Sequence, residues 1–97
     1  MYKIVLTRQA AKDAQAIGRT GMKEKAVTLI QVIRENPFQT PPTYEKLRGE
    51  ERTYSRRINI QHRIVYEVHP NAENEQDEHG NVYQGIIKVI RMWSHYE

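Results

Sequence analysis

Three arginines lie close together in a strongly β-forming stretch, "YSRRINIQHRIVYEV" (residues 54–68). Arg56 and Arg57 are adjacent, and Arg63 follows shortly after them. A turn at residues 59–61 would place Arg57 opposite Arg63 on one face of a hairpin. Neighbouring guanidiniums repel each other unless an anion lies between them, and the planar fork of arginine binds phosphate oxygens in pairs. The pattern therefore indicates either a phosphate-binding site or two exposed arginines bonded to nearby Asp or Glu side chains.

Two further side chains can transfer protons. Glu45 lies beside Lys46 and Arg48, and a carboxylate in cationic surroundings stays ionised and can accept a proton. His95 closely follows an apolar segment, and histidine is the side chain best suited to donate a proton near neutral pH. Acid–base cleavage of an RNA phosphodiester needs a base, an acid and cations, and it needs no metal. The alternative is that Glu45 is an ordinary solvated carboxylate and His95 an idle terminal residue.

The sequence offers little for other kinds of catalytic site. It has no cysteine, which excludes a disulfide framework, a thiolate metal site and a cysteine nucleophile. His62, His69 and His79 fall in or near predicted turns and lack the spacing of a metal site. Tyr96, next to His95, can stack on a base or donate a hydrogen bond. We therefore expect neither a metal nor a cofactor.

The composition is that of a globular protein. With 97 residues, of which 38% are hydrophobic and 28% charged, the chain is expected to form a single domain, residues 1–97. It shows neither a signal peptide nor an apolar run of the roughly 20 residues that span a membrane. The cytoplasm is therefore the expected compartment.

The net charge of +3 averages two unlike parts of the chain. Residues 71–79, "NAENEQDEH", contain four acidic side chains and no Lys or Arg. The remainder has 15 basic and 8 acidic side chains, a balance of +7. Such a basic body either binds a polyanion, RNA or DNA, or is an ordinary solvated surface.

The first half of the chain predicts a strand at residues 2–6 and two helices. Thr7 can cap the first helix, and the second runs over residues 22–35 before two proline-containing turns end it. Apolar residues at helical spacing mark the predicted inner faces: Ala10, Ala11, Ala14 and Ile17 in the first helix, and Met22, Ala26, Leu29, Ile30 and Ile33 in the second.

The second half alternates with the period of two that is typical of strands. Residues 52–68 predict a hairpin with a turn near residues 59–62, in which Ile58 and Ile60 share the apolar face. A long solvated turn, residues 71–80, leads to a last strand at residues 82–93, whose two apolar faces indicate a central position. The predicted fold is α+β: a strand, two helices and then an antiparallel sheet, with the helices on one sheet face.

Taken together, "YEKLRG", "YSRRINIQHRIVYEV" and "MWSHYE" resemble the YoeB/Txe branch of the RelE-like bacterial toxins. Members of that branch show a Glu-x-Leu-basic motif, an aromatic-Ser-Arg-Arg-Ile run, a His-Arg-hydrophobic-Val-Tyr run and a terminal His-Tyr. The resemblance is residue by residue over residues 44–68 and 91–96, and element order extends it over the whole chain.

This resemblance implies a toxin of a type II toxin–antitoxin system that cuts mRNA on the ribosome and is inhibited by a cognate antitoxin; a homodimer is compatible with it. By position, Glu45 is the implied general base and His95 the general acid. Arg63 is the implied transition-state clamp, Arg57 a phosphate-binding support, and Tyr96 the aromatic that stacks on or orients the substrate. Further RNA contacts are expected from Arg56, Arg48 and Lys46.

The chain departs from the family pattern at two places. The acidic turn, residues 71–80, is longer than the connection typical of this branch, and Glu97 extends past the usual terminal tyrosine. Two alternatives to the ribonuclease remain open: a gyrase-directed toxin of the same superfamily, and a catalytically silent RNA-binding module. The terminal His-Tyr and the arginine pattern argue against the gyrase-directed class.

Overall fold

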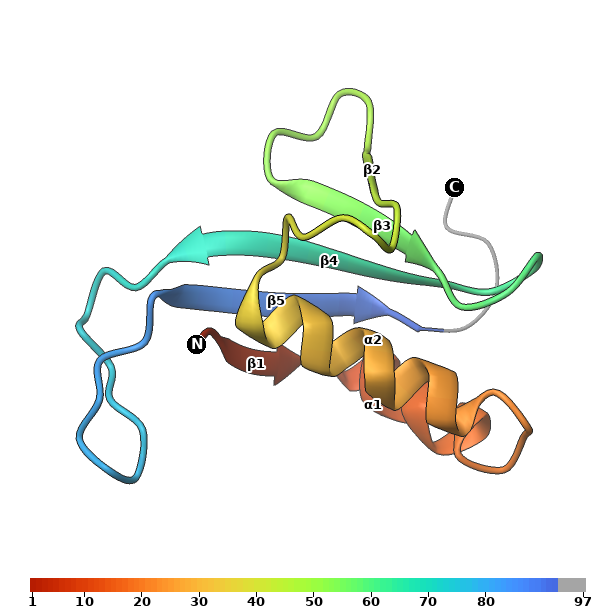
Figure 1. Ribbon diagram of the computed structural model, residues 1–97, viewed down its shortest axis with the longest axis horizontal. Helices are drawn as coiled ribbons and strands as arrows, with labels where there is room; N and C mark the ends of the chain where they lie inside the picture. The colour runs from red at the N-terminus through yellow and green to blue at the C-terminus, as the bar shows by residue number, and fades with distance from the viewer. Residues whose placement is uncertain (93–97) are drawn as a thin grey trace.

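The computed structural model describes residues 1–92, and within them two helices pack on a five-stranded sheet (Figure 1). The elements in chain order are β1 (Lys3–Leu6), α1 (Arg8–Ile17), α2 (Lys23–Glu35), β2 (Glu45–Lys46), β3 (Thr53–Arg57), β4 (Arg63–Pro70) and β5 (Gly85–Arg91). The sheet order is β1-β5-β4-β3-β2. Strand β1 runs parallel to β5, and the other neighbours are antiparallel. The predicted α+β fold is confirmed, with the additions that β1 makes the sheet mixed and that β2 forms an extra edge strand.

Helix α1 begins after Thr7, whose Oγ1 accepts a hydrogen bond of 3.0 Å from the amide of Ala10. This side chain supplies a partner for one of the amides that a helix start leaves unpaired. Ala10 and Ile17 are buried as predicted, whereas Ala11 is exposed and Asp13 is buried. The inner face of α1 therefore includes an acidic residue that the apolar pattern passed over.

The hydrophobic core lies between the helices and the central strands. Both helices and strands β4 and β5 supply most of its buried residues, and the β3–β4 turn and the residue after β5 supply one each: Ala10, Ile17, Ala26, Leu29, Ile33, Ile58, Ile64, Tyr66, Ile87, Val89 and Met92. The predicted inner face of α2 is confirmed, with Met22 and Ile30 only partly buried. Within residues 1–92 neither helix combines the length and the apolar composition that crossing a membrane requires.

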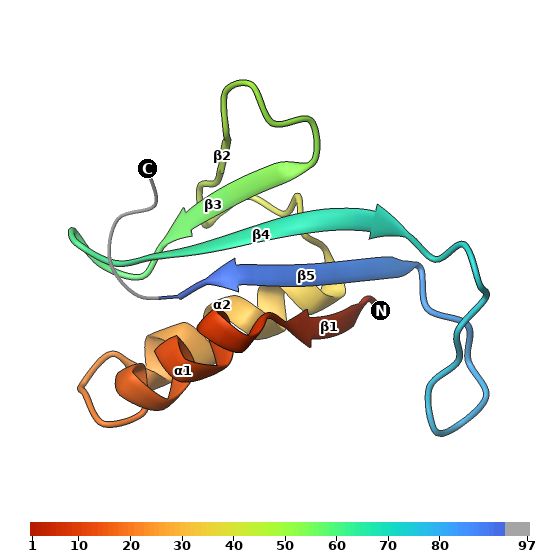
Figure 2. The ribbon, with the colours of Figure 1, turned by 180° about the vertical axis from the view of Figure 1, so that it is seen from behind.

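Strand β5 lies between β1 and β4, which confirms the central position predicted for the last strand. Figures 1 and 2 show both helices near the edge of the sheet that β1 and β5 form, while β3 and β2 form the other edge. The strand is shorter than the predicted residues 82–93, because the preceding loop continues to Gln84.

The turn between β3 and β4 is longer than predicted. Oδ1 of Asn59 accepts hydrogen bonds of 2.8 Å from the amides of Gln61 and His62, a local side-chain turn that competes with strand pairing. Ile58 is buried but lies outside the strand, and Ile60 is 86% exposed at the tip. The expectation that Ile60 shares the apolar face of the hairpin is wrong.

The acidic segment that the sequence presents as a solvated turn has its own hydrogen bonds. The side-chain amide of Asn71 donates to the carbonyl oxygens of Glu75 and Tyr83, each at 3.0 Å. Oδ1 of Asp77 accepts from the amides of His79 and Asn81 at 2.8 and 3.0 Å. Most of these residues are exposed as expected, but the backbone is folded into a hairpin-like loop.

Candidate active site

Strand β3 presents different residues on its two faces. Tyr54 pairs with Tyr66 of the core, so Tyr54 and Arg56 point toward the helices. Ser55 and Arg57 point away from them. Arg57 lies directly opposite Arg63 of β4, which confirms the predicted register of the hairpin. The face of β3 and β4 that is turned away from the helices therefore carries two guanidiniums next to each other.

Strand β2 brings the predicted base to this face. Glu45 pairs with Ser55 across the sheet, and its Oε2 lies 3.4 Å from Nη1 of Arg63. The same Arg63 nitrogen donates a hydrogen bond of 3.0 Å to Oγ of Ser55. The Glu45 side chain is 59% exposed and that of Arg63 22%. The carboxylate is therefore accessible to a ligand, whereas the guanidinium is fixed by its hydrogen bond to Ser55. The structure thus brings together Glu45, Arg57 and Arg63, which the sequence predicted as site residues.

These side chains line a pocket of about 290 Å³. The pocket extends around the edge of β3, beyond the last residue paired with β2, because its other lining residues include Lys25 and Leu29 of α2, on the helix side, as well as Ser55, Pro42 and Thr43. One carboxylate and three cationic groups face this space, which suits a phosphate group. Within residues 1–92 no acidic side chain forms an ion pair with Arg57.

Among the pocket residues that the sequence did not predict, Lys25 and Ser55 carry polar groups next to the arginines. Lys25 is an ordinary exposed residue of α2, and only the packing of α2 on the sheet reveals that it lines the pocket. Ser55 was visible in the aromatic-Ser-Arg-Arg-Ile run, but its role was not. It is 1% exposed and directs Arg63 toward Glu45.

Lys46 and Arg48, expected to contact RNA, lie next to the pocket rather than in it. Both line a separate shallow hollow formed by the loop between β2 and β3. Both are exposed, with Arg48 in that loop and Lys46 in β2 opposite Tyr54. The same hollow is also lined by Glu50 and Glu51, so it is of mixed charge.

Arg56 does not have the surface position that RNA contact requires. It is 1% exposed, and its guanidinium donates hydrogen bonds to the carbonyl oxygens of Pro37, Gln39 and Pro42 at 3.0, 2.8 and 2.6 Å. The prediction that Arg56 binds RNA is therefore wrong for this structure. The strand alternation turns this arginine inward, where backbone carbonyls take up its donors.

His95 and Tyr96 lie outside the described residues. The described chain ends at Met92, and Asp13 of α1 fixes that end: its Oδ2 accepts hydrogen bonds from Nε of Arg91 at 2.8 Å and from the Met92 amide at 3.0 Å. Burial by itself would raise the pKa of the Asp13 carboxyl, but the hydrogen bonds from Arg91 and Met92 outweigh it and lower that pKa. A charged group of α1 thus anchors the end of β5.

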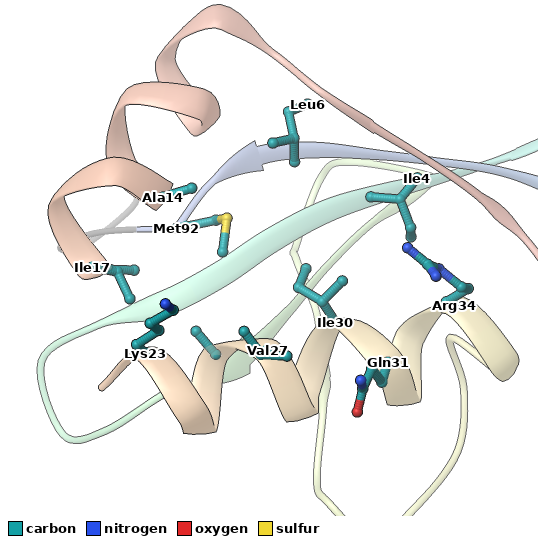
Figure 3. A pocket seen from close by; sticks show the side chains of 11 residues that line it. Ile4, Leu6, Ala14, Ile17, Lys23, Val27, Ile30, Gln31, Arg34 and Met92 are labelled. Atoms are coloured by element: carbon teal, nitrogen blue, oxygen red, sulfur yellow. The ribbon is translucent and has the colours of Figure 1, made fainter. Parts of the chain in front are cut away.

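A second hollow, of about 480 Å³, lies between the two helices and β1. Figure 3 shows its mostly apolar side chains, among them Ile4 and Leu6 of β1 and Val27 and Ile30 of α2. The charged side chains in its lining, Lys23 and Arg34, are both basic (Figure 3). It contains no Asp, Glu or His among the described residues, so it lacks the groups for acid–base chemistry and is better suited to a protein segment. We call it the apolar groove.

Comparison with known proteins identifies the family and the fold of the chain. A family model described as the YoeB-like toxin of the bacterial type II toxin-antitoxin system matches residues 11–96. A YoeB/ParE toxin from Agrobacterium tumefaciens is 30% identical with a TM-score of 0.77, over 97% of this chain and 99% of that one. A YoeB dimer from Staphylococcus aureus is 27% identical with a TM-score of 0.72, over 98% of both chains.

A YoeB–YefM complex from Staphylococcus aureus contains a chain that is 27% identical with a TM-score of 0.68, over 99% of both chains. No curated protein sequence matches the chain. The matching family model covers most of the chain, including the strands that carry Glu45, Arg57 and Arg63. The chain therefore belongs to the YoeB-like toxins of bacterial type II toxin–antitoxin systems.

Proposed function

We propose that this toxin is a ribosome-dependent endoribonuclease that cuts mRNA by general acid–base catalysis. The observation that carries the proposal is the contact of 3.4 Å between Glu45 and Arg63 in a pocket that also holds Arg57. A base beside cations is the arrangement that a 2′-hydroxyl attack on phosphorus requires.

In this reaction Glu45 removes the proton from the ribose 2′-hydroxyl as its oxygen bonds to phosphorus. The bond from phosphorus to the 5′-oxygen breaks, and His95 gives that oxygen a proton. Arg63 and Arg57 bind the non-bridging oxygens, whose negative charge is greatest in the transition state. Tyr96 stacks on or orients the substrate, whereas Lys46 and Arg48 contact the RNA backbone.

The proposed binding to the ribosome is supported by the charge of the chain. Outside the acidic residues 71–79 the chain carries a balance of +7, which suits ribosomal RNA, and a toxin acting on ribosomes would work in the cytoplasm. Each phosphate contact releases a counterion, so co-sedimentation with ribosomes should weaken steeply as salt is raised. Binding that is indifferent to salt would remove the RNA-docking part of the proposal.

The decisive experiment is cleavage of mRNA on programmed ribosomes, with the 5′-ends of the products mapped. Wild type should cut within the decoding site. A His95→Gln variant should lose about 10²–10⁴-fold in single-turnover rate while its ribosome binding changes little. A His95→Gln variant that cuts at the wild-type rate would remove the acid assignment. Growth arrest with a DNA-damage response and uncut mRNA would indicate the gyrase-directed class instead.

A cognate antitoxin is the proposed protein partner, since a Staphylococcus aureus relative is described as a YoeB–YefM complex. An acidic and apolar segment would be attracted to Arg57 and Arg63, and the apolar groove, with Lys23 and Arg34 in its lining, offers a second place of the same chemistry. Strong expression of the wild-type chain should therefore stop growth unless a co-encoded partner is present. Robust growth without a partner would count against the proposal.

Self-association is part of the same proposal, because another Staphylococcus aureus relative is described as a YoeB dimer. Analytical ultracentrifugation of the free toxin, in its His95→Gln form to permit expression, should give the mass of a dimer. A monomer at every concentration would exclude this part.

A further inference from the structure

Arg56 is a charged residue in the interior, and its contacts converge on one loop. Its guanidinium reaches three carbonyl oxygens of residues 37–42, "PFQTPP", at distances from 2.6 to 3.0 Å. We call this segment the 37–42 loop. Burying a guanidinium is costly unless its donors are satisfied. The loop supplies the acceptors, so loop and arginine hold each other in place.

Tyr66 completes the contact from the central strand β4. Its hydroxyl accepts a hydrogen bond of 3.2 Å from Nε of Arg56 and donates one of 2.8 Å to the carbonyl of Pro37. Burial raises the pKa of this hydroxyl against the opposing effect of Arg56, so the hydroxyl keeps the proton that it donates. The 37–42 loop is thereby connected to the fully buried part of the sheet.

Aromatic rings extend the same contact to the residue before Glu45. The guanidinium carbon of Arg56 lies 5.1 Å from the centre of the Tyr44 ring, within the range of a cation–π interaction. Tyr44 in turn packs edge-on against Tyr54, with ring centres 5.9 Å apart. Phe38 of the loop packs against both of these rings, at 6.0 and 5.2 Å.

Glu45 has little else to fix it. Strand β2 is only two residues long, the Glu45 side chain is 59% exposed, and its contact with Arg63 is a long one at 3.4 Å. A strand this short gives few ladder hydrogen bonds, so its position depends on the segment that leads into it. That segment is the 37–42 loop with Tyr44.

We propose that Arg56 and Tyr66 form a buried clamp on the 37–42 loop that positions Glu45 opposite Arg63. We call this set of contacts the Arg56 clamp. Its two members are positioning residues, because neither reaches the pocket. The proposal rests on the proposed base role of Glu45, and it adds that the rate of RNA cleavage depends on interior contacts made on the other face of β3.

The test uses two variants that weaken the clamp without emptying the core. Arg56→Lys keeps the charge and loses the planar fork, and Tyr66→Phe removes only the hydroxyl. Arg19→Lys is the matched control, since Arg19 is exposed and takes no part in the site. Single-turnover cleavage on programmed ribosomes, at saturating toxin, is measured for each variant in the wild-type and Glu45→Ala backgrounds.

If the clamp acts through Glu45, each variant slows cleavage by about 10–10²-fold in the wild-type background, because misplacing a reacting group is expensive. In the Glu45→Ala background the same changes should cost less than about 2-fold, since the group being positioned is gone. The Arg19→Lys control should be neutral in both. Equal slowing in both backgrounds would overturn the proposal, because a general loss of folded protein acts regardless of Glu45.

A second readout does not depend on catalysis. The Leu47 amide donates a hydrogen bond of 2.9 Å to the Thr53 carbonyl and therefore reports on the pairing of β2 with β3. Hydrogen exchange of this amide should become faster in Arg56→Lys and Tyr66→Phe, with the amides of β5 unchanged. Unchanged Leu47 exchange would overturn the clamp even if wild type proved to cut no RNA, and that last result would refute the proposed function alone.

Discussion

The two faces of strand β3 use the same kind of side chain in opposite ways. On the side of the helices, Arg56 is 1% exposed and its donors are taken up by loop carbonyls and the Tyr66 hydroxyl. On the other side, Arg57 is exposed beside Arg63, whose contact with Glu45 is a loose 3.4 Å. Four hydrogen bonds within the fold hold Arg56, whereas no acidic side chain within residues 1–92 forms an ion pair with Arg57.

This difference shows that position along a strand decides what a charge does. Successive side chains of a strand point to opposite faces, so adjacent arginines cannot both serve one site. On the buried face Arg56 holds the 37–42 loop, and on the other face Arg57 forms no ion pair with the acidic side chains of residues 1–92. A guanidinium whose donors are already bonded has none left for a phosphate, whereas an exposed one binds it in pairs.

The largest expected effect comes from breaking the buried face. Replacing Arg56 by Met leaves the carbonyls of Gln39 and Pro42 without this donor. The Pro37 carbonyl keeps its hydrogen bond from the Tyr66 hydroxyl, which itself loses the donor Arg56. Each buried polar group left unpaired costs about 1–3 kcal/mol. We expect a loss of at least about 3 kcal/mol in the free energy of unfolding. Urea unfolding followed by circular dichroism measures it. Arg57→Met is the control on the other face and should leave the midpoint nearly unchanged; equal losses would contradict the division between the faces.

Removing the base on the exposed face should slow the reaction without unfolding the protein. Glu45→Ala should reduce single-turnover cleavage by about 10²-fold, the lower end for an acid–base group, because water or ribosomal groups can accept the proton. Its urea midpoint should match wild type, since the side chain is 59% exposed. A Glu45→Ala variant that unfolds early, or that cuts as fast as wild type, would disagree with this assignment.

A smaller effect is expected at the end of β5. The pKa of Asp13 is lowered by its hydrogen bonds from Arg91 and Met92 despite burial, so the folded state binds its proton less readily than the unfolded chain. This stabilisation is present above the ordinary aspartate value of 3.8 and is lost as the pH falls through the lower folded value. Asp13→Asn should lower the free energy of unfolding by about 1–2 kcal/mol at pH 7 and by almost nothing at pH values below the folded pKa of Asp13. Urea titrations across this range test it, and a difference that is constant with pH would exclude the carboxylate as its cause.

The smallest effect is expected where the acidic loop meets β1. Nζ of Lys3 lies 2.6 Å from Glu75, but both side chains are about 40% exposed, and exposed ion pairs contribute little. Lys3→Ala should leave the urea midpoint within the scatter of replicate measurements, at low and at high salt alike. A clear destabilisation that disappears in high salt would show that this loop contributes to the fold.

The strand alternation of the sequence predicts that the Arg56 side chain points inward. Tyr54, Arg56 and Ile58 share one parity, and two of the three are residues expected in a core. The sequence nevertheless predicts an RNA contact for Arg56, because a charge can be assigned to an inward position only when its acceptors are known. Those acceptors are backbone carbonyls of the 37–42 loop, and no residue pattern predicts that this loop lies against Arg56.

The contacts between segments that are distant in the sequence could not be predicted from the sequence either. The register that sets Arg57 opposite Arg63 followed from a local hairpin, so it was predictable. Strand β2 has two residues and no alternation to detect, and the approach of Glu45 to Arg63 depends on it. The same holds for Lys25, which reaches the pocket only through the packing of α2.

Single-turnover mRNA cleavage on programmed ribosomes by Arg63→Ala, beside wild type, tests the role of the exposed face most directly. Arg63 lines the pocket, contacts Glu45 and is oriented by Ser55. Loss of a group that stabilises transition-state charge should lower the rate by about 10²–10³-fold, with ribosome binding and the urea midpoint close to wild type. An Arg63→Ala toxin that cuts mRNA at the wild-type rate would contradict the assignment of this face to catalysis.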